Sequence, residues 1–136
     1  MEDKDTCLMT NTAVTAAAGT TDYLSAGAVQ NAPGANLYMR FDCTTTCDSA
    51  TDAAVVTCSI QADDNTSFST PTTLAASGGL AIGSANLIAN GTTLVPIPYN
   101  SVPAEKYIRG YISPATENLT AGKFSVCIVT NPARNL

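Results

Sequence analysis

The sequence predicts an all-β fold, namely a single-domain β-sandwich or jelly roll of about eight antiparallel strands. Two observations support this class. Apolar and polar residues alternate along several short segments, as they do in strands that bury one face. Turn-forming groups such as Ser77-Gly78-Gly79 and Asn90-Gly91 separate these segments, and a turn about every 8–12 residues is typical of sandwiches and barrels.

Alternation is clearest in four segments. They are residues 37–41 ("LYMRF"), 56–62 ("VTCSIQA"), 107–113 ("YIRGYIS") and 124–130 ("FSVCIVT"). Shorter candidate strands are residues 12–17, 23–26, 72–76, 85–89 and 92–97. Asn90-Gly91 stands between two of these and predicts a hairpin turn, because both residues tolerate a positive φ.

Composition limits the partners that the chain can bind. Its 136 residues suit one domain, only 12% of them are charged, and 11 acidic against 6 basic residues give a net charge of −5. No cluster of Lys and Arg is present, so neither nucleic acid nor an anionic membrane is expected as a partner. No apolar run reaches the ~18 residues of a membrane span. The acidic start "MEDKDTCLMT" lacks an apolar signal-peptide core, so we expect no export by that route.

The polar start of the chain precedes the first clear turn. We interpret residues 1–18 as a candidate flexible arm, with Leu8 and Met9 as candidate anchors on a neighbouring molecule, and residues 19–136 as the jelly-roll domain. A frayed terminus is the alternative interpretation.

Five cysteines leave the redox state open. The number is odd, and a chain of this size folds without covalent links, so mostly free thiols are expected, with Cys58 and Cys127 as small buried residues. A local disulfide between the loop residues Cys43 and Cys47 remains an alternative. The spacing lacks the paired Cys-x-x-Cys pattern of zinc sites, so no zinc is expected.

Catalysis and metal binding find little support. The chain has no histidine, which excludes Ser-His-Asp and Cys-His chemistry, and no pair of carboxylates stands out for acid-base work. The stretch "DDNTSF" begins like a calcium loop at Asp63, but Phe68 stands where that loop needs glycine and Leu74 where it needs glutamate. We therefore expect no cofactor and no metal, and a strand-to-strand corner with Asp63 and Asp64 facing water.

One short segment concentrates interface-type residues. In "KYIRGY", alternation puts Tyr107, Arg109 and Tyr111 on one face of a strand. Tyrosine and arginine are enriched among residues that dominate binding energies. The same face can instead pack beneath a neighbouring part of the protein, and the sequence leaves both interpretations open.

The order of motifs over the second half of the chain is distinctive. An alternating strand leads into "QADDNTSFSTPTTL", a proline-bearing apolar strand "GTTLVPIP" follows, and "EKYIRGY" and "TAGKFSV" come near the end. In this order, over about residues 54–130, the chain resembles the jelly-roll capsid cement, or decoration, proteins of tailed bacteriophages.

This resemblance implies a structural role without enzymatic activity. Such a protein binds the outer surface of the phage capsid, bridges neighbouring major capsid protein subunits of the HK97-like fold, and stabilises the shell against internal DNA pressure. It implies a homo-oligomer, dimer or trimer, made in the host bacterial cytoplasm and located on the virion. The alternative is a carbohydrate-binding, lectin-like sandwich of a tail or fibre, which the absence of tryptophan disfavours.

Overall fold

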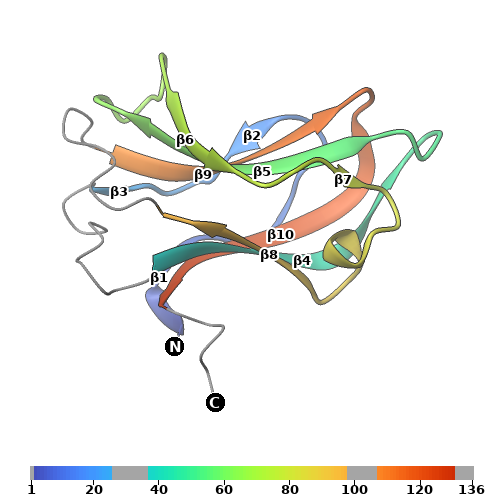
Figure 1. The fold of residues 1–136 in the computed structure, drawn as a ribbon, viewed down its shortest axis with the longest axis horizontal. Coiled ribbons are helices and arrows are strands. Elements are labelled where there is room, and N and C mark those ends of the chain that lie inside the picture. The colour runs from blue at the N-terminus through green and yellow to red at the C-terminus, as the bar shows by residue number, and fades with distance from the viewer. Residues whose placement is uncertain (1, 26–36, 98–106, 131–136) are drawn as a thin grey trace.

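Two antiparallel sheets packed face to face form a β-sandwich (Figure 1), which confirms the predicted all-β class. The structure is a computed structural model and describes residues 2–25, 37–97 and 107–130. Its elements are β1 (Glu2–Ala13), β2 (Ala18–Gly19), β3 (Leu24–Ser25), β4 (Leu37–Ser49), β5 (Val55–Asp63), β6 (Thr72–Ala76), β7 (Leu80–Ala81), the 3₁₀ turn η2 (Ala85–Leu87), β8 (Gly91–Pro96), β9 (Tyr107–Ala115) and β10 (Leu119–Thr130). No helix within these ranges has the length and apolar character needed to cross a membrane.

The strand order is that of a jelly roll. The first sheet runs β1-β10-β4-β8 and the second β2-β9-β5-β6, with β3 also paired to β9 and β7 also paired to β5. Because β2 and β3 share one side of β9, and β6 and β7 share one side of β5, each pair fills one strand position. The eight positions then run 1-8-3-6 in one sheet and 2-7-4-5 in the other, so the chain crosses repeatedly between the sheets.

The core lies between the sheets and is filled by alternate residues of the long strands. In β5 the alternation puts Val56, Cys58, Ile60 and Ala62 on the inward face, and all four are fully buried. The facing sheet contributes Met39, Phe41, Phe124 and Val126. Each large apolar side chain buried in this way stabilises the fold by about 1.5–3 kcal/mol.

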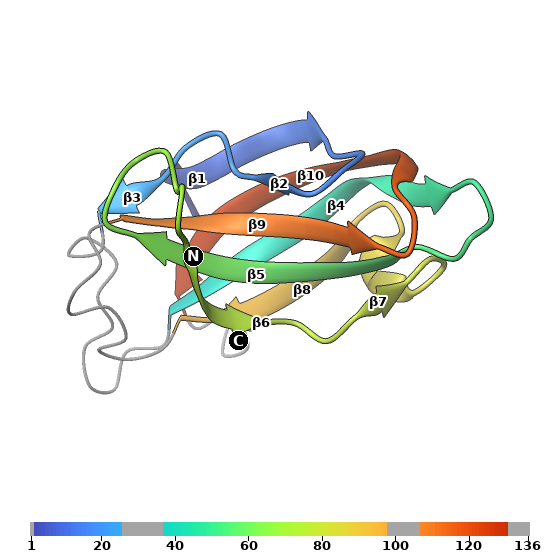
Figure 2. The same cartoon turned by 90° about the horizontal axis from the view of Figure 1, so that it is seen from above.

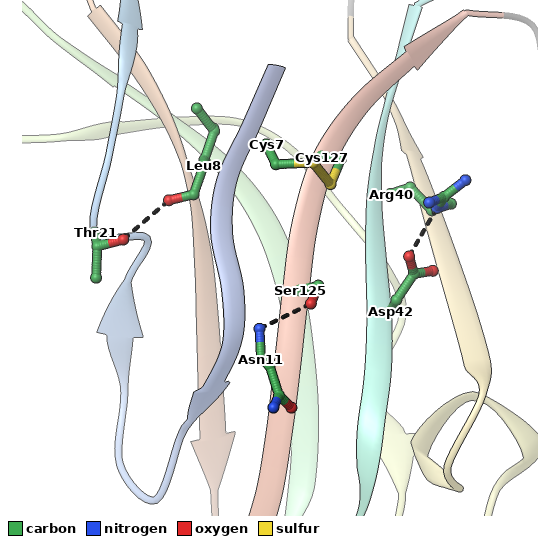
Figure 3. Close-up of a disulfide and its surroundings, with 8 residues drawn as sticks. All are labelled: Cys7, Leu8, Asn11, Thr21, Arg40, Asp42, Ser125 and Cys127. Atoms are coloured by element: carbon green, nitrogen blue, oxygen red, sulfur yellow. Dashed lines mark hydrogen bonds and ion pairs between the residues drawn. A yellow bond between two sulfur atoms is a disulfide. The ribbon is translucent and has the colours of Figure 1, made fainter. Parts of the chain in front are cut away.

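The N-terminal segment differs from the expected arm. Residues 2–13 form β1, an edge strand that pairs with β10, and Leu8 and Met9 are only 1% and 4% exposed. Two consecutive side chains face the core because the register shifts between Cys7 and Met9, a bulge that breaks the alternation. The carbonyl of Leu8 also accepts a hydrogen bond from Oγ1 of Thr21, at 3.1 Å (Figure 3), and another from the backbone N–H of Asp22, at 3.0 Å.

Two local predictions need correction. Residues 85–89 form the 3₁₀ turn η2 and its exit instead of a strand, so Asn90-Gly91 does not join a two-strand hairpin. Asn90 does adopt the expected positive φ of 74°, and its backbone N–H donates to the carbonyl of Cys43 at 2.8 Å. The segment "CTTTC" lies inside the long strand β4, not in a loop.

Candidate interaction surface

Strand β9 carries three of the five predicted interface residues on its outward face. Tyr107, Arg109 and Tyr111 are half-buried and alternate with the buried Ile108 and Ile112, which point into the core. In the second sheet β9 lies between β5 and the β2–β3 position (Figure 2), so both of its long sides are paired. The sequence pattern therefore predicted this shared face correctly.

Arg109 is held in one position by contacts from several directions. Its Nε and Nη2 atoms donate hydrogen bonds to Oε1 of Gln61, at 3.0 and 2.9 Å, from the residue directly opposite in β5. The guanidinium carbon lies 4.4 Å from the ring centre of Phe68 and 5.4 Å from that of Tyr111, both within cation–π range. Gly19 in β2 leaves room for this side chain, because a Cβ at that position would stand 2.4 Å from Nη1 of Arg109.

Aromatic rings extend this arrangement towards β3. The ring of Tyr23 meets that of Tyr107 edge-on at a centroid distance of 5.3 Å, and lies 6.3 Å from that of Phe68. Tyr23 is 43% exposed, so the cluster reaches solvent at this end. We call the following set the aromatic–arginine surface: Tyr23, Gln61, Phe68, Tyr107, Arg109 and Tyr111.

The acidic corner after β5 builds one wall of this surface. Asp63 is only 1% exposed, which corrects the expectation that it faces water, whereas Asp64 is exposed as expected. The Asp63 carboxylate accepts backbone hydrogen bonds from Asp64 at 2.6 Å and from Thr70 at 2.9 Å, so it closes the loop between them. Phe68, within this loop, has a φ of +51° and is 6% exposed, with its ring against Arg109.

The charges of this corner follow from its hydrogen bonds. Burial acts to raise the pKa of Asp63, but the backbone hydrogen bonds from Thr70 and Asp64 outweigh it and leave the pKa below the ordinary value. Burial lowers the pKa of Arg109, and the proximity of Tyr111 and Asp63 opposes that shift. An arginine remains charged at physiological pH in this situation, so the surface combines a fixed cation with aromatic rings.

The structure does not bring the two groups of predicted interface residues together. Leu8 and Met9 belong to the core and to the first sheet, whereas Tyr107, Arg109 and Tyr111 lie on the outward face of the second sheet. Three members of the surface were not predicted as interface residues. The alternation of residues 56–62 places Gln61 on the outward face, and the register of β5 and β9 pairs it with Arg109. Phe68 and Tyr23 lie outside the regular strands, and no sequence signal places them here.

The cysteines differ in part from the expectation of free thiols. Cys7 and Cys127 lie opposite each other in β1 and β10 and form a disulfide (Figure 3), so Cys127 is not a free thiol. Cys43, Cys47 and Cys58 are free and buried, and no Cys43–Cys47 disulfide forms, although their sulfurs lie 3.9 Å apart.

Burial also controls the chemistry of the free thiols. It raises the pKa of Cys47 and of Cys58 to about 12, and it raises the pKa of Cys43 as well. A thiolate is the nucleophilic form of cysteine. These three side chains therefore act as small core residues and not as nucleophiles at neutral pH.

The carboxylate of Glu117 is used to accept hydrogen bonds from the residues around Thr51. Glu117 accepts hydrogen bonds from the hydroxyl of Thr51 and from the backbone N–H groups of Thr51, at 3.1 Å, and Ala53, at 3.2 Å. The side-chain hydrogen bond from Thr51 is the main reason that the pKa of Glu117 is lowered. Within the described part of the chain, no group of three or more His, Cys, Asp or Glu side chains is arranged to hold a metal ion.

Comparison with known proteins gives one finding. No curated protein matches the chain. A family model described as Bbp16 matches residues 8–128, which includes every strand from β2 to β9, half of β1 and most of β10. The match agrees with the resemblance noted in the sequence. The chain therefore belongs to the Bbp16 family, a family of phage capsid decoration, or cement, proteins.

Proposed function

We propose that this protein binds the outer surface of the assembled capsid and cements neighbouring major capsid protein subunits, so that the shell resists the pressure of packaged DNA. The observation that carries this proposal is the Bbp16 family match over residues 8–128. The composition supports it, because a chain with only 12% charged residues has a surface suited to extended protein contact.

The proposed partner is a major capsid protein of the HK97-like fold, and the proposed contact is the aromatic–arginine surface. Tyrosine and arginine side chains supply large contact areas and directional hydrogen bonds, and they dominate many interfaces. Here Tyr107, Arg109 and Tyr111 are half-buried and ordered by their neighbours before any partner arrives. Less conformational entropy is then lost on binding.

The protein acts on the shell as a homo-oligomer, a dimer or a trimer. Linking two or three copies lets one assembly grip several capsid subunits, and each further contact forms at a high effective concentration. The net charge of −5 makes nucleic acid and anionic membranes unsuitable partners. In this proposal the protein is made in the host bacterial cytoplasm and resides on the outside of the virion.

Co-sedimentation with expanded, undecorated capsids of its own phage tests the proposal. We expect the wild-type protein to pellet with the capsids in a saturable manner and Tyr107→Ala to bind more weakly. Leu94→Ala is the matched control, because Leu94 is also an exposed large apolar residue, 40% exposed, but lies on β8 in the other sheet. A wild-type protein that stays in the supernatant at every concentration would contradict the proposal.

A further inference from the structure

We infer that Arg109 receives a carboxylate from an aspartate or glutamate side chain of the capsid shell. The inference rests on the proposed function and specifies the chemistry of the partner at the aromatic–arginine surface. It follows from three properties of Arg109: the donors it leaves unused, the lack of an ion-pair partner among the described residues, and its fixed position.

The hydrogen bonds to Gln61 use only one edge of the guanidinium group. A guanidinium carries five N–H bonds, and the Nε and Nη2 atoms each donate one of theirs to Oε1 of Gln61. No described residue accepts a hydrogen bond from Nη1 of Arg109. Among the described residues, Nη1 is also not one of the fully buried side-chain atoms that lack a hydrogen-bond partner, so it is not fully buried. One N–H of Nη2 and two of Nη1 therefore remain, and the edge between these nitrogens matches the two oxygens of a carboxylate.

The charge of Arg109 has no direct counter-ion in the described part of the protein. Arg40, by contrast, pairs with Asp42 at 2.9 Å. Asp63 is the acidic residue that influences Arg109 electrostatically, but its two oxygens accept backbone hydrogen bonds from Asp64 and Thr70. A half-buried guanidinium without an ion-pair partner carries a desolvation cost, and a carboxylate from a partner molecule offsets that cost on binding.

The position of the cation is set in advance. Phe68 and Tyr111 flank the guanidinium, Gln61 fixes its orientation, and the missing side chain of Gly19 provides the space it occupies. A long arginine side chain normally loses rotamer freedom when it forms an interface contact. This loss is largely avoided here, because the internal contacts already hold the side chain.

The carboxylate is assigned to the capsid and not to a second copy or to a nucleic acid. In the proposed homo-oligomer, Arg109 of each copy faces the shell and not the neighbouring copy, and the oligomeric state of Arg109→Gln tests this placement. A phosphate backbone needs several clustered cations, whereas Arg109 is the one cation of the aromatic–arginine surface as the described residues form it, and it lies against two aromatic rings. A carboxylate side chain on a protein partner satisfies one guanidinium and leaves the tyrosines to contact apolar neighbours.

The test measures the affinity of purified variants for undecorated capsids by co-sedimentation, at low and moderate salt. Removing one member of a buried, hydrogen-bonded charge pair typically weakens binding by at least about 30-fold, so we expect that loss for Arg109→Gln. Gly19→Ala keeps the charge but displaces the guanidinium, and should also weaken binding. Arg109→Lys keeps the charge but lacks the two parallel N–H donors of a guanidinium, so its affinity should lie between those of wild type and Arg109→Gln. Arg40→Gln is the control for net charge and should bind like wild type. Melting curves establish that each variant is folded.

Each result has a defined meaning. Loss of binding in Arg109→Gln and Gly19→Ala, together with loss of the salt dependence seen in wild type, supports the inference. Equal binding by wild type and Arg109→Gln overturns it and leaves the proposed function intact. Equal loss in Arg40→Gln, or a change in oligomeric state in Arg109→Gln, overturns it by pointing to general electrostatics or to a second copy. Failure of wild type itself to bind refutes the proposed function and the inference with it.

Discussion

The disulfide between Cys7 and Cys127 joins strands at opposite ends of the chain, and its removal should be costly. The two residues are 120 positions apart. In the chain-entropy model, closing a loop of that length lowers the conformational entropy of the unfolded state by about 16 cal/mol/K, which stabilises the folded state by about 5 kcal/mol at 25 °C. For a domain of this size the loss should lower Tm by roughly 15 °C. The replacement Cys7→Ala is preferred because Cys7 is only half-buried, whereas Cys127 is 3% exposed.

Urea unfolding with and without a reducing agent measures this contribution. Oxidised wild type should unfold at a clearly higher urea concentration than Cys7→Ala, and reduced wild type should coincide with the variant. Cys43→Ala is the matched control, because it removes a buried free thiol and should keep its response to reduction. Identical unfolding of oxidised wild type and Cys7→Ala, or five free thiols in the oxidised protein by mass spectrometry, would refute the reasoning.

Three further predictions concern positions within the fold. Leu8→Ala should lower the free energy of unfolding by about 2–5 kcal/mol in urea titrations, because Leu8 is 1% exposed in the core; a cost near zero would restore the arm interpretation. Gly122→Ala should cost about 1–3 kcal/mol, since Gly122 has a φ of +147° and its Cβ would lie 2.8 Å from the sulfur of Cys47; an unchanged Tm would contradict this. The pKa values of Asp63 and Glu117 are lowered from the ordinary values of 3.8 and 4.5, so each carboxylate stabilises the fold at a pH above its ordinary pKa, and this stability is lost as the pH falls through the lowered pKa. Asp63→Asn and Glu117→Gln should therefore each weaken the dependence of Tm on acid pH. Curves of Tm against pH that run parallel to wild type would contradict this.

Local alternation explains which parts of the fold could be predicted. The predicted strand at residues 107–113 lies within β9, where half-buried and buried residues alternate regularly. The strand at residues 72–76 has the predicted bounds although none of its residues is fully buried, and the predicted strand at residues 56–62 lies within β5, which is buried at every position from Cys58 onwards. The bulge in β1 breaks the alternation, so Leu8 and Met9 looked like part of a polar, unpaired segment. In η2, Asn86 donates a side-chain hydrogen bond to the carbonyl of Thr92 at 2.8 Å, a contact that favours a turn where apolar content suggested a strand.

Long-range contacts were beyond the reach of the sequence. The pairing of Cys7 with Cys127 depends on the register of two strands that are far apart in the chain. The shared face of Tyr107, Arg109 and Tyr111 needs only one strand, so it could be predicted. Its neighbours from other segments depend on how loops fold back over the sheet, which a single sequence does not encode in any local pattern.

The most direct test of the cementing role is the temperature at which undecorated, DNA-filled capsids release their DNA. Capsids saturated with the wild-type protein should release DNA at a higher temperature than bare capsids, and the increase should level off when all binding positions are filled. A saturable rise is the expected result. An unchanged release temperature with the protein demonstrably bound would contradict it.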